Sequence, residues 1–195
     1  MTFVTPPRRP AWYLRIALWV ARRITGKDPL PGRVLALFPK AALGVGIFEA
    51  AAAHAPRDLD ARSLAIARIV ASVIGGCPFC IDMNAATWQR AGLSSIELER
   101  LLALDWPSSL SPRERAAAAY SRALSQTPVV VDPALLHSLQ GAFTDREIVV
   151  LAFTIAQVNF WTRFNQGVGI PAAGFFEESV CALPTIPLHT YQRAK

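Results

Sequence analysis

Apolar side chains recur every three or four positions over most of this chain, and prolines separate one such segment from the next. This period is typical of amphipathic helices, and the alternating valine-rich runs of strands are scarce. The pattern therefore predicts an all-α fold. The expected helices cover residues 11–24, 33–55 with a break near Pro39, 61–74, 78–91, a segment that starts near 95, 112–125, a short segment from 133, and 145–168.

Residues that favour helix starts precede most of these segments. A Ser, Thr or Asp side chain accepts a hydrogen bond from a free N–H group of the first turn, and a glutamate three residues later completes a capping box. Capping therefore explains Glu114 and Glu147 without any further chemistry. The expected caps are Asp60, Ser94 or Ser95, Ser111, Asp132 and Thr144.

The apolar content is high for a soluble monomer. Of the 195 residues, 52% are hydrophobic and 17% charged, and the mean hydropathy is +0.30. A membrane-spanning helix would need about 18 consecutive apolar residues, and the two richest segments are interrupted, residues 35–55 by Lys40 and Glu49 and residues 148–161 by Gln157 and Asn159. We therefore expect no membrane span and a homo-oligomer. Residues 61–74 carry only two charges, so this helix is expected at the centre of the fold.

The net charge of +6 is concentrated near the N-terminus. A basic excess can indicate nucleic acid or an anionic membrane surface as a partner, but no nucleic-acid motif accompanies it, so no nucleic-acid partner is expected. We interpret residues 1–29 as a solvated basic helix and arm, with residues 26–32 as a linker. Residues 11–20 make a poor export signal because Arg15 interrupts them. A cytoplasmic location is expected.

Cys77 and Cys80 stand in the segment Gly-Gly-Cys-Pro-Phe-Cys, where the glycines end one helix and Pro78 suits the first turn of the next. This spacing places two sulfurs one turn apart at a helix N-terminus, which favours a thiolate. A redox pair is the favoured interpretation. The alternatives are two cysteines that only pack in a core and a zinc site, for which the other cysteine and the histidines, Cys181, His54, His137 and His189, are too scattered. No metal or cofactor is expected.

Three segments together resemble the carboxymuconolactone decarboxylase-like superfamily, which includes the AhpD alkylhydroperoxidases. They are residues 62–84 around the cysteine pair, residues 110–120, and residues 143–165. The resemblance implies an AhpD-like helical bundle that assembles as a homo-oligomer. It places the domain at residues 30–175, after the basic arm and before a tail at residues 176–195.

For AhpD-type members, the resemblance implies reduction of a hydroperoxide. Cys80 would attack the peroxide and become a sulfenic acid, Cys77 would condense with it to a disulfide, and an external thiol reductant would restore the pair. Two alternatives remain. One is a thiol–disulfide protein with weak peroxidase activity, and the other is a non-redox enzyme or binding protein related to the decarboxylases.

This chain departs from the family's proton relay at two positions. Asn84 stands where the family has a histidine, and Ala65 where it has a glutamate. Asn84 lies at i+4 from Cys80 and is expected to donate a hydrogen bond to the thiolate or to a peroxide oxygen. Asp82, two residues after Cys80, either takes part in the site or stabilises its helix.

Other charged and polar residues are candidates near the site. Glu49 is considered as a replacement base, and Arg62 or Arg68 as a positive charge that lowers a thiol pKa. Three polar residues recur on the last long helix, where a subunit contact is favoured over a pocket. They are Asn159, Arg163 and Gln166.

Overall fold

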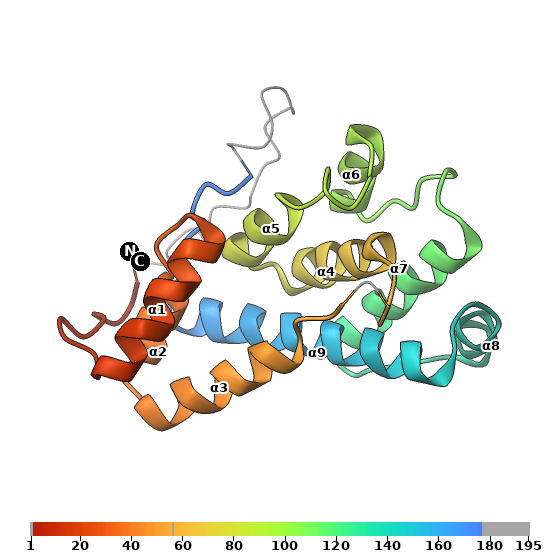
Figure 1. Cartoon of the computed structure of the whole chain (residues 1–195). Coiled ribbons are helices and arrows are strands. Elements are labelled where there is room, and N and C mark those ends of the chain that lie inside the picture. The colour runs from red at the N-terminus through yellow and green to blue at the C-terminus, as the bar shows by residue number, and fades with distance from the viewer. Residues whose placement is uncertain (1, 56, 177–195) are drawn as a thin grey trace.

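The computed structural model describes residues 2–55 and 57–176, and within these ranges the chain forms nine α-helices and no strand (Figure 1). The all-α prediction is confirmed. The helices are α1 (Trp12–Thr25), α2 (Leu30–Leu35), α3 (Pro39–Ala51), α4 (Ala61–Gly75), α5 (Pro78–Ala85), α6 (Ser95–Leu102), α7 (Pro112–Ser125), α8 (Pro133–Ala142) and α9 (Asp145–Gly167). Cys181, His189 and the tail expected from residue 177 onward lie outside the described residues.

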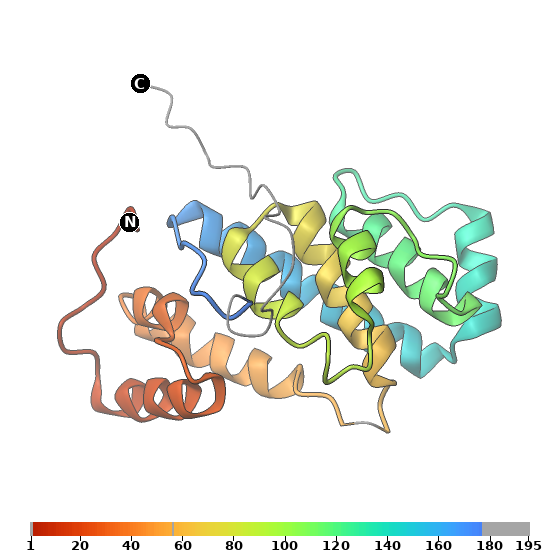
Figure 2. The same ribbon diagram turned by 90° about the horizontal axis from the view of Figure 1, so that it is seen from above.

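Helix α4 lies at the centre and packs against α5, α6, α7 and α9 (Figures 1 and 2). Its residues 63–67 and 69–72 are all buried, as expected for a helix that is apolar on every side. One face packs with α7, α8 and α9 around Leu151 and Ile155. The other face packs with α6 around Leu98 and Leu101. The central position predicted for this helix is confirmed.

The predicted helix caps account for most of the helix starts. Asp60 accepts a hydrogen bond from the Ser63 amide at 2.8 Å, and Asp132 accepts one from the Leu135 amide at 2.8 Å. Capping boxes begin three further helices, each with a glutamate at the third position. The pairs are Ser94 with Glu97, Ser111 with Glu114, and Thr144 with Glu147.

Three expected elements differ from the structure, and one of them, the helical region expected to reach residue 55, ends at Ala51. Residues 30–35, partly assigned to a linker, form the short helix α2, because Pro31 lies in its first turn, where proline costs no hydrogen bond. Helix α5 ends at Ala85 rather than near residue 91. The following residues make tight turns, in which the Trp88 amide donates to the Ala85 carbonyl at 3.1 Å. This change of direction lets Trp88 pack on the core between α4 and α6.

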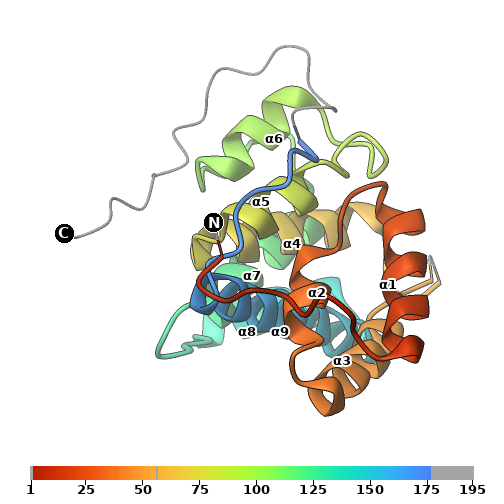
Figure 3. The ribbon, with the colours of Figure 1, turned by 90° about the vertical axis from the view of Figure 1, so that its left-hand side faces the viewer.

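Helices α1, α2 and α3 lie together at one end of the molecule (Figure 3). Leu14 is the one buried side chain of α1, and α3 buries none. No helix in the described parts of the chain is long and apolar enough to cross a membrane. The homo-oligomer expected from the apolar composition, and the division into an arm, a domain and a tail, stay predictions.

Candidate functional site

A tight turn joins α4 to α5 and brings Cys77 to the start of α5. Gly76 has a φ of 63°, a left-handed conformation that glycine adopts without strain. Gly75 lies directly against α9, since a Cβ atom at this position would lie 2.8 Å from the Thr162 side chain. The two glycines therefore let α4 end against α9 and let the chain reverse into α5.

The two sulfurs of the pair face each other. Cys77 is the N-cap residue of α5, and its Sγ accepts a hydrogen bond from the Cys80 backbone amide at 3.2 Å. The Cys77 and Cys80 Sγ atoms lie 2.6 Å apart, and both cysteines are free. A disulfide bond is about 2.05 Å long, so only a small movement separates the two thiols from a covalent link.

Both cysteines are buried. Cys77 is 0% and Cys80 1% exposed, and they share an apolar cluster with Val34, Phe79 and Ile170. Aromatic side chains pack around this cluster from α9 and from the segment that follows it. They are Trp161, Phe164 and Phe175. A substrate therefore reaches the sulfurs only when part of this cover moves.

The electrostatics of the pair favour a thiolate on Cys77. The hydrogen bond between the two sulfurs lowers the pKa of Cys77, and burial opposes this. The Cys80 amide, the Asn165 side chain and the Phe79 amide lower it further. The pKa of Cys80 is raised by the hydrogen bond between the two sulfurs, by burial, and by repulsion from a negative charge on Cys77. These directions place the negative charge of the singly ionised pair mainly on Cys77, whereas the family resemblance assigns the attacking sulfur to Cys80.

Asn165 on α9 contacts the pair and was not among the residues selected from the sequence. Its Nδ2 lies 3.5 Å from Cys80 Sγ, and the side chain is fully buried. Its Oδ1 has no hydrogen-bond partner among the described residues. The available signal was helical periodicity, since Asn165 continues the buried stripe of α9 that includes Ile155, Val158 and Thr162.

Asn84 donates to groups other than the sulfurs in this structure, and its expected role toward a thiolate or a peroxide stays a prediction. Its Nδ2 donates to the Ser72 hydroxyl at 2.8 Å and to the Cys80 carbonyl at 2.9 Å. Both N–H donors of the amide are thus engaged away from the sulfurs. The i+4 spacing placed Asn84 on the face of α5 that points to the core. On that face its amide donates to Ser72 of α4 and not to a sulfur.

Asp82 holds the cover of the site in place. Its two carboxylate oxygens accept hydrogen bonds from the backbone amides of Ala173, at 2.8 Å, and Phe176, at 2.7 Å. The Phe175 ring lies between these two anchors in the chain and contacts the Phe79 ring, with centroids 5.9 Å apart. Asp82 therefore ties the segment after α9 over the two cysteines. Within the described residues, its carboxylate makes no hydrogen bond to the sulfur of Cys77 or Cys80.

Of the candidate replacement groups, Glu49 is joined to the surroundings of the cysteines through Trp161, and Arg68 interacts with Glu49. Glu49 Oε1 accepts hydrogen bonds from Gln157, at 2.8 Å, and from Trp161 Nε1, at 2.7 Å. Trp161 packs on the cysteine cluster. Burial lowers the pKa of Arg68, and the negative charge of the nearby Glu49 carboxylate partly offsets this lowering. Glu49 as a base stays a prediction.

Arg62 and Ala65, the two remaining positions considered from the sequence, lie away from the cysteine pair. Arg62 forms ion pairs with Glu97, at 2.9 Å, and with Glu114, so its charge is neutralised away from the cysteines. Ala65, at the family's glutamate position, lies in the core between α4 and α6.

The three polar residues selected on the last helix make contacts within the chain. Asn159 donates to the Ser125 hydroxyl at 3.2 Å, and Arg163 donates to Thr127 at 3.5 Å, which ties α9 to the end of α7. Gln166 donates to the Gly75 carbonyl at 2.8 Å. Gln166 therefore supports the turn before the cysteine pair, and the structure gives no separate evidence for the expected subunit contact.

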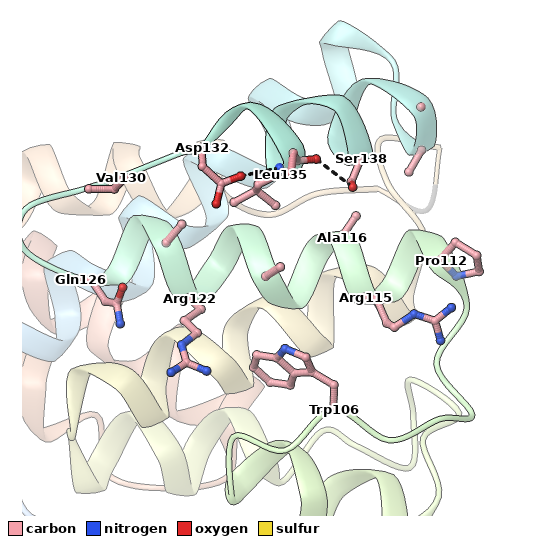
Figure 4. A pocket seen from close by; sticks show the side chains of 15 residues that line it. Trp106, Pro112, Arg115, Ala116, Arg122, Gln126, Val130, Asp132, Leu135 and Ser138 are labelled. Carbon is pink, nitrogen blue, oxygen red and sulfur yellow. Dashed lines mark hydrogen bonds between the residues drawn. The ribbon is translucent and has the colours of Figure 1, made fainter.

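A groove of about 710 Å³ lies between α7 and α8 (Figure 4). Its lining includes Trp106, Arg115 and Arg122 but neither cysteine nor any member of the surrounding cluster. This groove is therefore not the route to the sulfurs. Across residues 2–55 and 57–176, no group of His, Cys, Asp and Glu side chains is arranged to hold a metal ion.

Comparison with known proteins gives the same fold. A peroxidase-related protein with an AhpD core from Ralstonia eutropha JMP134 superimposes with a TM-score of 0.77, at 17% identity, over 90% of this chain and 94% of that one. The debrominase Bmp8 superimposes with a TM-score of 0.75, at 21% identity, over 92% of this chain and 96% of that one. At these identities the likeness shows the fold alone.

Sequence comparison shows the family. The uncharacterized protein YnjA of Escherichia coli K12 is 34% identical over 179 residues, which span 88% of this chain and 91% of that protein. The model of the carboxymuconolactone decarboxylase family matches residues 39–123, from the start of α3 through most of α7, and so includes both cysteines. The chain therefore belongs to the carboxymuconolactone decarboxylase family.

Proposed function

We propose that the Cys77–Cys80 pair reduces hydroperoxides with electrons from an external thiol reductant. The observation that carries this proposal is the pair itself, with two free sulfurs 2.6 Å apart and one of them at a helix N-cap. A buried pair that only packed would gain nothing from this arrangement, whereas a dithiol that cycles to a disulfide requires it.

The reaction balances with the groups present and one co-substrate. The Cys77 thiolate attacks the terminal peroxide oxygen, an S–O bond forms, the O–O bond breaks, and the alkoxide leaves as an alcohol after taking a proton from solvent. The Cys80 thiol then condenses with the Cys77 sulfenic acid, and the products are a disulfide and water. Two electrons have passed from the pair to the peroxide. An external dithiol, or two thiols, returns them by thiol–disulfide exchange.

The choice of Cys77 as the attacking sulfur rests on charge. The Cys80 amide donates to Cys77 Sγ, and Asn84, which cannot take a proton near neutral pH, is bound to Ser72. Asn84 therefore cannot act as a base for Cys80, and in this proposal Cys80 is the resolving thiol.

Trapping the sulfenic acid tests this assignment. After one equivalent of cumene hydroperoxide, the Cys80→Ser variant should be labelled by dimedone at Cys77, and the Cys77→Ser variant should show little label. Cys181→Ser is the control and should consume peroxide like the native protein. Strong labelling of Cys80 in Cys77→Ser, with none of Cys77 in Cys80→Ser, would return the attacking role to Cys80.

Reductive dehalogenation of an aromatic compound is a second candidate. It is favoured by the rings of Trp161, Phe164 and Phe175 that pack around the cysteines, since rings of this kind contact a flat aromatic ligand well. The debrominase of the same fold has been solved with 2,3,4-tribromopyrrole. The balanced step converts an aryl bromide and two thiols into the hydrogen-substituted ring, bromide, a proton and a disulfide. Bromide release from bromopyrroles by the reduced protein, without peroxide consumption, would favour this candidate over the first.

A further inference from the structure

Helix α1 carries its large apolar side chains on the face that points to solvent. Trp12 is 71%, Ile16 56% and Trp19 59% exposed. With Val20, which is also exposed, they are spaced i, i+4, i+7 and i+8, so they form one stripe along the helix. The opposite face of α1 contacts the rest of the protein through Leu14, the one buried residue of this helix. In an ordinary surface helix the apolar stripe points inward.

The entire net positive charge of the protein lies in and around this helix. Residues 1–27 contain six basic residues and no acidic one, and the whole chain has 20 basic and 14 acidic residues. Residues 28–195 therefore contain fourteen of each and are neutral overall. The basic residues are Arg8, Arg9, Arg15, Arg22, Arg23 and Lys27.

Charged and apolar groups are interleaved on α1. The Arg23 guanidinium lies 5.4 Å from the centre of the Trp19 ring, while Arg15 and Arg22 lie along one edge of the stripe and are exposed. Long basic side chains beside tryptophan are typical of helices that lie at a membrane surface, where the rings enter the headgroup region and the charges contact lipid phosphates.

We propose that α1 binds the surface of a membrane rich in anionic lipids. The helix has 14 residues and is about 21 Å long, which is too short to span a hydrocarbon core of about 30 Å. It therefore lies in the plane of the surface, with Trp12, Ile16 and Trp19 toward the acyl chains. Helix α1 lies at one end of the molecule (Figure 3), and no described residue covers the face that carries Trp12 and Trp19.

Two other occupants fit this face less well. A second copy related by a twofold axis beside α1 would bring α1 against α1 and so set one basic cluster against another. Nucleic acid would attract the arginines, but Ile16, Val20 and Ile24 would stay exposed to water in such a complex. An anionic bilayer is the partner that satisfies both the charges and the apolar stripe.

Vesicle co-sedimentation of the full chain tests the proposal. We expect binding to vesicles made of equal amounts of phosphatidylcholine and phosphatidylglycerol, weaker binding as salt rises, and little binding to phosphatidylcholine alone. One basic residue at an anionic surface contributes about five-fold in affinity. The double variant Arg15→Glu/Arg22→Glu should therefore bind at least about thirty-fold more weakly. The matched control Arg57→Glu/Arg90→Glu changes the charge equally at two exposed positions outside α1 and should lose much less.

A second measurement locates the contact. Vesicles whose acyl chains carry bromine quench only tryptophans that reach them, so quenching should disappear in Trp12→Phe/Trp19→Phe and persist in Trp106→Phe. The proposal would be overturned if the protein bound both vesicle types equally, or if Arg15→Glu/Arg22→Glu bound as tightly as the native chain. The proposal would also be overturned if the native chain did not bind vesicles but formed an oligomer that Arg15→Glu/Arg22→Glu abolished. That result would assign the face to a second copy. If duplex DNA displaced the protein from vesicles and brominated lipid did not quench its tryptophans, the α1 face would be assigned to nucleic acid.

Discussion

Asn165 Nδ2 on α9 lies 3.5 Å from Cys80 Sγ on α5, so a buried amide contacts the cysteine pair across 85 positions of the chain. Its amide hydrogen favours negative charge at the pair, while its Oδ1 lacks a hydrogen-bond partner among the described residues. A buried unpaired carbonyl is unfavourable for folding. We therefore predict that Asn165 lowers the stability of the fold and promotes ionisation of the pair.

Replacing Asn165 by leucine should separate these two effects. Asn165→Leu removes the donor without leaving a large cavity, so the thiolate of the pair should form at higher pH and alkylation at neutral pH should slow several-fold. Stability should be unchanged or higher by about 1 kcal/mol, because the unpaired oxygen is gone. Iodoacetamide rates against pH, together with urea unfolding, measure both. In the control Asn159→Leu, which lies away from the sulfurs, a shift of similar size would refute the role of Asn165.

Loosening the anchor at Asp82 should expose the cysteines. Asp82→Asn replaces one acceptor oxygen by an N–H₂ group that faces the amide of Ala173 or Phe176, so one of the two bonds is lost. We expect a fall of about 2 kcal/mol in stability and alkylation of the native protein that is faster than in the wild type. Asp105→Asn, on the surface, serves as the comparison. Unchanged access to Cys77 and Cys80 in Asp82→Asn would mean that another part of the fold opens.

The close contact between α4 and α9 can be tested at Gly75. A Cβ atom there would lie 2.8 Å from Thr162, so Gly75→Ala must push the helices apart and should destabilise the protein by about 1–3 kcal/mol. Gly44→Ala is the matched substitution, because nothing lies within 4 Å of its added Cβ, and it should stabilise α3 by about 0.5–1 kcal/mol. Thermal unfolding of both variants decides this, and equal effects would contradict the packing described.

The acid stability of the protein should depend on Glu97. Burial opposes its ionisation, but the Ser94 amide, the Arg62 guanidinium and the Ser109 hydroxyl lower its pKa to about 2, against 4.5 for a free glutamate. Below pH 4.5 the unfolded chain therefore binds a proton that the folded chain does not. This contribution is complete above pH 4.5 and is lost as the pH falls toward 2, by at most about 3 kcal/mol.

Urea unfolding between these pH values measures that loss. Glu97→Gln should flatten the dependence of stability on pH in this window, whereas Glu99→Gln, exposed on the same helix, should leave it unchanged. A wild-type slope that survives in Glu97→Gln would place the acid sensitivity at another carboxylate.

Local signals in the sequence were sufficient for most helix starts and for the cysteine pair. Caps such as Asp60 and Thr144 act within one turn, and so does the spacing of Cys77 and Cys80, so neither depends on the rest of the fold. The end of α5 could not be predicted in this way, because Trp88 leaves the helix to pack on a core formed by α4 and α6. The contacts of Asn84 with Ser72 and of Asn165 with Cys80 could not be predicted for the same reason, since each joins two different helices.

The most direct test of the redox assignment is a single-turnover titration of the fully reduced protein with cumene hydroperoxide. Free thiols are counted and the peptides are mapped after each addition. The proposal predicts that one equivalent of peroxide removes two thiols and yields a disulfide between Cys77 and Cys80, with Cys181 still free. Two intact thiols at Cys77 and Cys80 under excess peroxide, in protein whose fold is unchanged, would contradict it.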